Sequence, residues 1–181
     1  MNLVVIGASY GGLYALMDLL GALAHDFPHP VVIAQHRAPD SDDGRLADVL
    51  SNYSVLPVCE AEDKELLEPG RVYLAPADYH VLVDGNHIAL AVDEPVNHSR
   101  PSIDVLFESA AAAFGSRTIA VLLTGLGSDG AAGIAAVRGA GGRTIVQEPA
   151  SALRAAMPQA GVDAGAAEVV PLDEIAPRLA A

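Results

Sequence analysis

The sequence predicts an α/β fold, with a doubly wound, mainly parallel sheet, helices on both faces and an antiparallel hairpin insert. Three observations predict it. Short apolar, partly β-branched runs alternate with segments whose apolar residues recur at helical spacing. Most of these runs are apolar throughout, as expected of strands covered on both faces. One central region instead contains short runs around a strong turn sequence.

The first part of the chain begins the strand–helix alternation. Residues 3–6 form an apolar run, followed by a glycine-rich loop and by leucines at helical spacing as far as Leu23. Residues 31–34 repeat the strand pattern, residues 44–50 are predicted to form a helix, and residues 55–58 a third short strand. Right-handed crossovers between such strands place helices on both faces of one sheet.

The pattern changes between residues 72 and 92. This region contains three short runs, VYLAP, HVLV and HIALAV. They are separated by Asp78 and by Asp84-Gly85-Asn86, and the second of these separators is a strong hairpin turn sequence. We therefore predict an antiparallel insert or an edge ribbon here.

The second half returns to the strand–helix alternation. Helical periodicity extends over residues 102–114, and Pro101 suits a position at the start of this helix. The most continuous strand is predicted at residues 118–123, followed by the loop TGLGSDG and a small-residue helix at 131–139. Later strands are predicted at 144–146 and 169–170, with helices between and after them. Because no repeat or linker divides the chain, we expect one domain over residues 1–181.

Composition excludes several classes of function. The formal net charge of -13 would repel nucleic-acid phosphates and anionic membranes. The single cysteine, Cys59, forms no internal disulfide and fits a reducing compartment. No basic region precedes an apolar run at the N-terminus, and no apolar stretch reaches the roughly 20 residues that span a bilayer. We therefore expect a cytoplasmic protein with no nucleic-acid partner and no membrane insertion.

Three loops carry side chains that suit acyl transfer. In a parallel α/β sheet, ligands bind beyond the carboxyl ends of the strands. Ser9 follows the first predicted strand, His36 follows the second, and Asp129 lies in the loop after the strand at 118–123. A hydroxyl, an imidazole and a carboxylate are the parts of a nucleophile, a base and an orienting group. Ser9 would also stand at a helix N-terminus, where unpaired backbone N–H groups can hold an oxyanion.

Each of these residues also has a plainer explanation. Ser9 can be a helix cap, His36 is one of six histidines, and Asp129 can cap a helix or interact with its dipole. The Gly-x-Ser-x-Gly motif is not an α/β-hydrolase elbow, because Ser9 follows the first strand and the order is Ser, His, Asp. A nucleotide-binding module is an alternative, although Ser9 replaces the second glycine and Arg37 stands where an acidic ribose partner is expected.

The three loops resemble, in order and spacing, the signature loops of the chemotaxis protein-glutamate methylesterases: GASYGG, QHR and LTGLGSDG. The segments PVNHSRPSIDVLF, LAP and AMP are also similar, so the resemblance covers nearly the whole chain. It implies hydrolysis of glutamyl methyl esters on the cytoplasmic helices of chemoreceptors, with deamidation of receptor glutamines as a second activity. It implies a catalytic triad of Ser9, His36 and Asp129. The expected substrate or oxyanion region contains Tyr10, Gly11, Leu126 and Arg100.

Some positions depart from the family pattern. Tyr10 stands where the family usually has threonine, and Leu126 and Arg37 replace methionines. Leucine for methionine conserves volume, whereas the Tyr10 ring could narrow the pocket. A weak or inactive family member acting as a signalling scaffold is therefore a second hypothesis. Because the first strand begins at residue 2 or 3, we expect no receiver domain and control by a separate regulator. No metal or organic cofactor is expected, since the histidines lack close ligand spacing.

Overall fold

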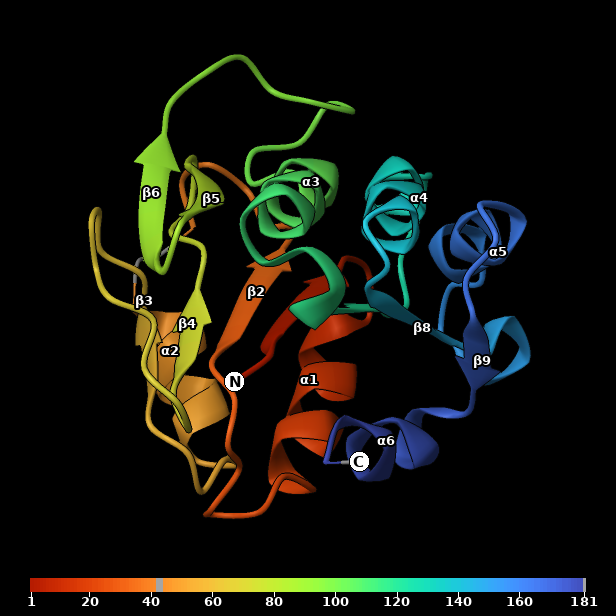
Figure 1. Cartoon of the computed structure of the whole chain (residues 1–181), viewed down its shortest axis with the longest axis horizontal. Coiled ribbons are helices and arrows are strands. Elements are labelled where there is room, and N and C mark those ends of the chain that lie inside the picture. Colours follow the sequence, from red (N-terminus) through yellow and green to blue (C-terminus); the bar gives the residue numbers. More distant parts are fainter. Residues whose placement is uncertain (42–43, 181) are drawn as a thin grey trace.

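The computed structural model describes residues 1–41 and 44–180, and it contains a seven-stranded parallel sheet (Figure 1). The strand order is β3-β4-β2-β1-β7-β8-β9. The predicted doubly wound α/β class is confirmed. The strands of this sheet are β1 (Leu3–Ala8), β2 (Val31–Gln35), β3 (Val58–Glu60), β4 (Val72–Leu74), β7 (Thr118–Leu122), β8 (Arg143–Gln147) and β9 (Glu168–Val170).

Helices cover both faces of the sheet (Figure 1). One face packs against α1 (Gly12–Gly21), α2 (Arg45–Ser51) and α6 (Ile175–Leu179). The other face packs against α3 (Ile103–Phe114), α4 (Ala131–Gly139) and α5 (Ala156–Asp163). Single 3-10 turns lie at Gly115–Arg117, Pro149–Ser151 and Leu172–Glu174. No helix in residues 1–41 and 44–180 is long and apolar enough to cross a membrane.

The central strand β1 has no solvent-facing side. Val4 and Ile6 pack into the core beneath α1, whereas Leu3 and Val5 pack into the core beneath α3. All four side chains are fully buried, and complete burial of such a side chain contributes about 1.5–3 kcal/mol. This two-sided burial explains the unbroken apolar run in the sequence, and it fixes the strand end from which the Ser9 loop begins.

The antiparallel insert is a hairpin of β5 (His80–Asp84) and β6 (His87–Ala91), which packs on α3. The predicted turn after Asp84 is confirmed. The expectation for residues 72–76 was wrong, because Val72–Leu74 belongs to the parallel sheet, between β2 and β3. A three-residue apolar strand carries no periodicity that distinguishes a sheet from a hairpin.

The strand predicted at residues 55–58 was also placed too early, since β3 begins at Val58. Leu56 is buried in the core, but the segment before Val58 is not paired. Pro57 has no N–H to donate to a ladder. Its carbonyl oxygen accepts the N–H of Val72 at 2.9 Å, so the strand itself starts only after the proline. Apolar burial without strand pairing therefore explains the shifted boundary.

Candidate active site

The three strands that carry the candidate side chains are neighbours in the sheet. β1 pairs with β2 on one side and with β7 on the other, all in parallel. Their carboxyl ends therefore lie at one edge, and the loops that follow them meet there. Ser9 follows β1, His36 follows β2, and Asp129 lies in the loop between β7 and α4.

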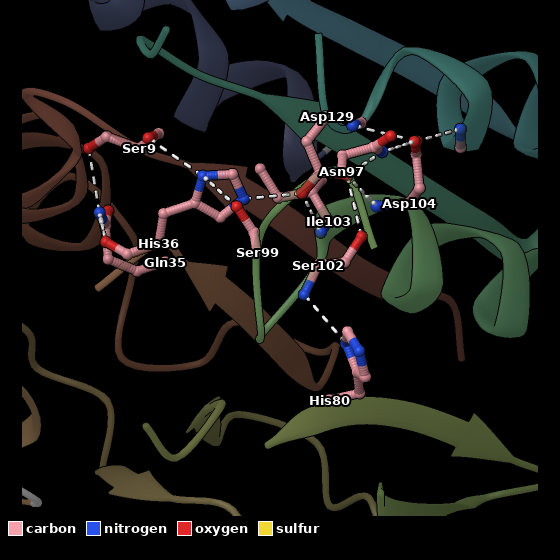
Figure 2. Close-up of polar contacts among 12 residues, drawn as sticks. Ser9, Gln35, His36, His80, Asn97, Ser99, Ser102, Ile103, Asp104 and Asp129 are labelled. Atoms are coloured by element: carbon pink, nitrogen blue, oxygen red, sulfur yellow. Dashed lines mark hydrogen bonds and ion pairs between the residues drawn. The ribbon is translucent and has the colours of Figure 1, made fainter. Parts of the chain in front are cut away.

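Ser9, His36 and Asp129 form one hydrogen-bonded row (Figure 2). The Oγ of Ser9 lies 3.1 Å from Nδ1 of His36, and Nε2 of His36 lies 2.6 Å from Oδ2 of Asp129. A carboxylate only accepts hydrogen bonds, so the imidazole hydrogen belongs on Nε2. The lone pair of Nδ1 then faces the Ser9 hydroxyl and can accept its proton.

The loop around Ser9 is held by its backbone. The N–H of Ser9 donates to the carbonyl of Thr124 at 3.0 Å, and the carbonyl of Ser9 accepts from Gly12 at 2.8 Å. The amide of Gln35 donates to the carbonyls of both Ser9 and His36, at 3.0 and 2.9 Å. Gln35 therefore couples the two loops directly. Sequence reasoning missed this residue, because an amide at the end of a strand has no distinctive pattern.

Glycines allow the loops to approach closely. A Cβ on Gly125 would lie 2.7 Å from the Cβ of Ser9, which is closer than side chains tolerate. Gly11 has φ of 82° at the start of α1, a left-handed conformation that favours glycine. Among the described residues, the N–H groups of Tyr10 and Gly11 donate to no acceptor. Both remain available beside the Ser9 hydroxyl.

Asp129 is almost fully buried and accepts five hydrogen bonds (Figure 2). Oδ2 accepts from Nε2 of His36 and from the N–H of Ile103. Oδ1 accepts from Asn97, from the hydroxyl of Ser102 and from the N–H of Asp104. Burial alone raises the pKa of Asp129, but the hydrogen bonds outweigh it and hold the pKa at about 2, below its usual 3.8.

A second buried carboxylate, Asp104, supports the first. Its Oδ1 accepts the N–H groups of Gly130 and Gly133 at 3.0 and 2.7 Å, at the start of α4. Its Oδ2 accepts from Nδ2 of Asn97 at 2.7 Å, and the same amide nitrogen donates to Asp129 at 2.9 Å. Burial raises the pKa of Asp104, and the charge of Asp129 raises it further. Asn97 thus bridges two carboxyl groups that would otherwise repel each other.

A polar cleft of about 320 Å³ opens beside His36. We call this the polar cleft; it is lined by His36, Asn97, His98, Ser99, Leu126, Gly127, Ser128 and Asp129. The hydroxyl of Ser99 lies 3.5 Å from Nδ1 of His36, the same nitrogen that faces Ser9. A second, mainly apolar cavity of about 370 Å³ also borders His36 and is lined by Leu13, Gln35, Arg37, Ser41, Arg45, Leu46 and Val49.

The residues expected in the substrate or oxyanion region divide into two groups. Tyr10 and Gly11 directly follow Ser9, whereas Leu126 lines the polar cleft, and the side chains of Tyr10 and Leu126 are exposed. Arg100 borders a smaller cavity beside His36, but its guanidinium makes four hydrogen bonds. These bind Asp78 and two backbone carbonyl groups, so Arg100 mainly fixes the loop that carries Asn97 and Ser99.

Sequence reasoning also missed the residues that surround Asp129 and the Nδ1 side of His36. The missed side chains are Asn97, Ser99, Ser102 and Asp104. All lie in the segment 95–107, and the only available signal was the resemblance of that segment to a family motif. Within residues 1–41 and 44–180, no group of three or more His, Cys, Asp or Glu side chains is arranged to hold a metal ion.

A parallel α/β fold with serine, histidine and aspartate in one hydrogen-bonded row is typical of serine hydrolases. A comparison with protein families makes the assignment more specific. A family model described as CheB methylesterase matches residues 4–179. The chain belongs to the CheB methylesterase family.

Individual relatives are similar over nearly the whole chain. The crystal structure of the Thermotoga maritima CheB methylesterase catalytic domain superposes with a TM-score of 0.93 at 36% identity, covering 99% of this chain and 97% of that one. A Carboxydothermus hydrogenoformans protein named protein-glutamate methylesterase/protein-glutamine glutaminase 1 is 45% identical over 99% of this chain, which spans 55% of that protein. A relative from Leptospira interrogans is 40% identical over 96% of this chain and 90% of its own length.

Proposed function

We propose that this chain is a protein-glutamate methylesterase that hydrolyses glutamyl methyl esters on the cytoplasmic helices of chemoreceptors. Ser9 is the nucleophile, His36 the general base, and Asp129 the group that orients His36. The observation that carries the proposal is the 3.1 Å approach of the Ser9 hydroxyl to Nδ1 of His36, whose opposite nitrogen is bound to a buried carboxylate. The names of the relatives supply the ester as the substrate.

The geometry supports a two-step reaction. Ser9 Oγ attacks the ester carbonyl carbon while Nδ1 of His36 takes the hydroxyl proton. Asp129 stays ionised and stabilises the imidazolium through Nε2–H. When the tetrahedral intermediate collapses, the methoxy oxygen takes the proton from Nδ1 and leaves as methanol, and an acyl group remains on Ser9. Water then loses a proton to the same nitrogen and attacks the acyl carbon. The bond to Ser9 Oγ breaks, Oγ takes the proton back from Nδ1, and the glutamate is released.

The oxyanion of the intermediate is held by backbone N–H groups. Those of Tyr10 and Gly11 stand at the start of α1 without an acceptor among the described residues. Two donors beside the nucleophile match the arrangement that stabilises such an oxyanion, and the dipole of the ten-residue helix α1 favours negative charge there.

Deamidation of glutamine is the second proposed activity. The relatives from Carboxydothermus and Bordetella bronchiseptica are also named protein-glutamine glutaminases. A glutamine side chain gives the same acyl group on Ser9, with ammonia in place of methanol as the leaving group. Ammonia is the poorer leaving group, so we expect the amide to react more slowly than the ester.

The direct test is methanol release from a methylated receptor fragment. The wild-type chain should release methanol, and Ser9→Ala should reduce the rate by at least about 10³-fold, as expected when a nucleophile is removed. Ser116→Ala is the matched control, since Ser116 is exposed before β7, at the opposite edge of the sheet. If the wild-type chain binds the fragment but releases no methanol, it is a scaffold and the proposed activity is wrong.

A further inference from the structure

Arg154 lies over the aromatic ring beside the proposed nucleophile. Tyr10 follows Ser9 directly, and its ring is about half exposed. The guanidinium carbon of Arg154 lies 4.7 Å from the centroid of this ring, within the range of a cation–π contact. Arg154 comes from the segment between β8 and α5, far from Tyr10 in the sequence.

The backbone of Arg154 is fixed to the same loops. Its N–H donates to the hydroxyl of Thr124 at 2.9 Å, and that hydroxyl donates to the carbonyl of Tyr10 at 3.0 Å. Its carbonyl accepts the N–H of Gly125, the residue that packs on Ser9. The neighbouring Leu153 side chain packs against Gly11. The backbone of Arg154 is therefore fixed beside the Ser9 loop, and its guanidinium lies over the Tyr10 ring.

Arg154 differs from most arginines of this chain in its partners. Five others pair with carboxylates: Arg37, Arg71, Arg100, Arg143 and Arg178. In the part of the chain that the structure describes, Arg154 has no carboxylate within 4.0 Å, and its guanidinium donates only to the carbonyl of Leu153. The site edge thus holds a positive charge without a counter-ion, in a protein whose formal net charge is -13.

We propose that Arg154 is a specificity-determining residue that recognises a carboxylate next to the ester on the substrate helix, and that Tyr10 positions its guanidinium. This inference rests on the proposed function. A methyl ester is neutral, so the charge of Arg154 is not needed for the ester itself. On a helix, a side chain three or four residues away lies on the same face. A planar guanidinium can bind the carboxylate of such a side chain through two parallel hydrogen bonds.

The test compares two helical peptides, each with one glutamyl methyl ester, that carry either glutamate or alanine four residues from the ester. Binding is measured by fluorescence anisotropy in the Ser9→Ala background, where turnover is blocked. We expect about fivefold tighter binding of the acidic peptide, the size of an exposed ion pair of good geometry. The preference should weaken at high salt. The ratio of the two affinities should fall to nearly one in Ser9→Ala/Arg154→Met, and Ser9→Ala/Arg154→Glu should prefer the alanine peptide.

Arg117 offers a matched control. Its guanidinium lies 4.8 Å from the ring centroid of Phe114, a contact of the same kind, at the opposite edge of the sheet. Ser9→Ala/Arg117→Met removes the same charge and should keep the fivefold preference. Equal binding of both peptides by the Ser9→Ala chain, or a preference that survives Arg154→Met, would overturn the inference. Methanol release by the wild-type chain is followed separately, and its absence alongside an intact binding preference would overturn only the proposed function.

Discussion

The two nitrogens of the His36 ring are held in very different ways. Nε2 meets a carboxylate that is 3% exposed and that four further donors fix, two of them backbone N–H groups at the start of α3. Nδ1 meets the single hydroxyl of Ser9, with Ser99 at a longer distance beside the polar cleft. One end of the ring is thus rigidly anchored, and the other faces Ser9 beside the polar cleft.

This difference indicates how the fold divides the work. An ionised carboxylate in a fixed position favours one tautomer of the ring and stabilises the imidazolium that forms during reaction. In the proposed reaction the other nitrogen needs room, because it exchanges protons first with the serine, then with the leaving group, and then with water. The structure therefore concentrates hydrogen bonds where no substrate atom has to enter.

We call the Nε2 side of His36, with Asp129 and its hydrogen-bond donors, the anchored region, and the Nδ1 side, with Ser9 and Ser99, the open region. The largest loss of ester hydrolysis is expected from Asp129→Asn in the anchored region. An amide NH₂ in place of Oδ2 would face the Nε2–H of His36 and force its proton onto Nδ1. That nitrogen could then no longer accept the proton of Ser9. We expect the rate of ester hydrolysis to fall by about 10²–10⁴-fold. Methanol release measures this, with Asp18→Asn on the exposed side of α1 as control. A loss of less than threefold would show that the anchor does not set the tautomer.

The same anchor predicts an acid-sensitive part of the stability. The pKa of Asp129 is about 2 in the folded chain against 3.8 ordinarily, so the unfolded chain binds more protons between these values. The lowered pKa of Asp129 contributes about 2 kcal/mol to the free energy of unfolding. This contribution is present above pH 4 and is lost as the pH falls towards 2. Urea unfolding between pH 2 and 6 should show a steeper loss for the wild-type chain than for Asp129→Asn. Parallel curves for the two chains would contradict the low pKa of Asp129.

A smaller loss of ester hydrolysis is expected from Asp104→Asn, because Asn97 links Asp104 to Asp129. In Asp104→Asn the oxygen can still accept Gly130 and Gly133, but the new NH₂ faces the NH₂ of Asn97 and breaks the bridge to Asp129. The rate should fall about tenfold, or 1.4 kcal/mol of barrier. Stability near pH 7 should change little, because burial has raised the pKa of Asp104 and its ionised form is costly there.

Asp104→Ala is the comparison that separates charge from hydrogen bonding. It leaves the N–H groups of Gly130 and Gly133 without an acceptor, and the free energy of unfolding should fall by about 1–3 kcal/mol. Chemical unfolding of both variants measures the difference. Equal stability of Asp104→Asn and Asp104→Ala would mean that these two hydrogen bonds contribute nothing.

The smallest change in kcat is expected from Ser99→Ala, in the open region. Ser99 lies 3.5 Å from Nδ1, against 3.1 Å for Ser9, so it is the weaker partner of this nitrogen. Ser99→Ala should change kcat by no more than about threefold, since loss of one weak neutral hydrogen bond is worth about 0.5 kcal/mol. A loss of a hundredfold would show that Ser99 takes part in proton transfer and that the Nδ1 side is less open than described.

The sequence predicted the open region better than the anchored one. Ser9 and His36 directly follow apolar runs, and the strand-end rule for parallel sheets brings such residues together without further information. Asn97 comes from the connection between the hairpin and α3, where no periodicity fixes the path of the chain. Asp104 lies in the first turn of α3, and the helical pattern of residues 102–114 does not indicate that this side chain meets Asn97. Asn97 even adopts φ of 51°, which depends on the surrounding contacts. The partners of Asp129 therefore required the structure.

The contact between Tyr10 and Arg154 was also invisible in the sequence. The departure of Tyr10 from the family pattern indicated that the edge of the site is unusual, but nothing in the chain paired it with a residue 144 positions later. Two loops from β1 and from the β8–α5 connection had to be placed at the same sheet edge first. Long-range pairs of exposed side chains leave no local pattern, unlike buried strands.

The division between an anchored and an open nitrogen is tested most directly by the rate at which a fluorophosphonate labels the chain. Peptide mapping should find one adduct, on Ser9, because its hydroxyl lies 3.1 Å from Nδ1 of His36, against 3.5 Å for the hydroxyl of Ser99. His36→Ala should slow labelling by at least about 10²-fold, the usual contribution of a general base, and Ser99→Ala should leave it within threefold. An adduct on Ser99 or Ser128, or an unchanged rate in His36→Ala, would contradict the assignment of Ser9 and His36.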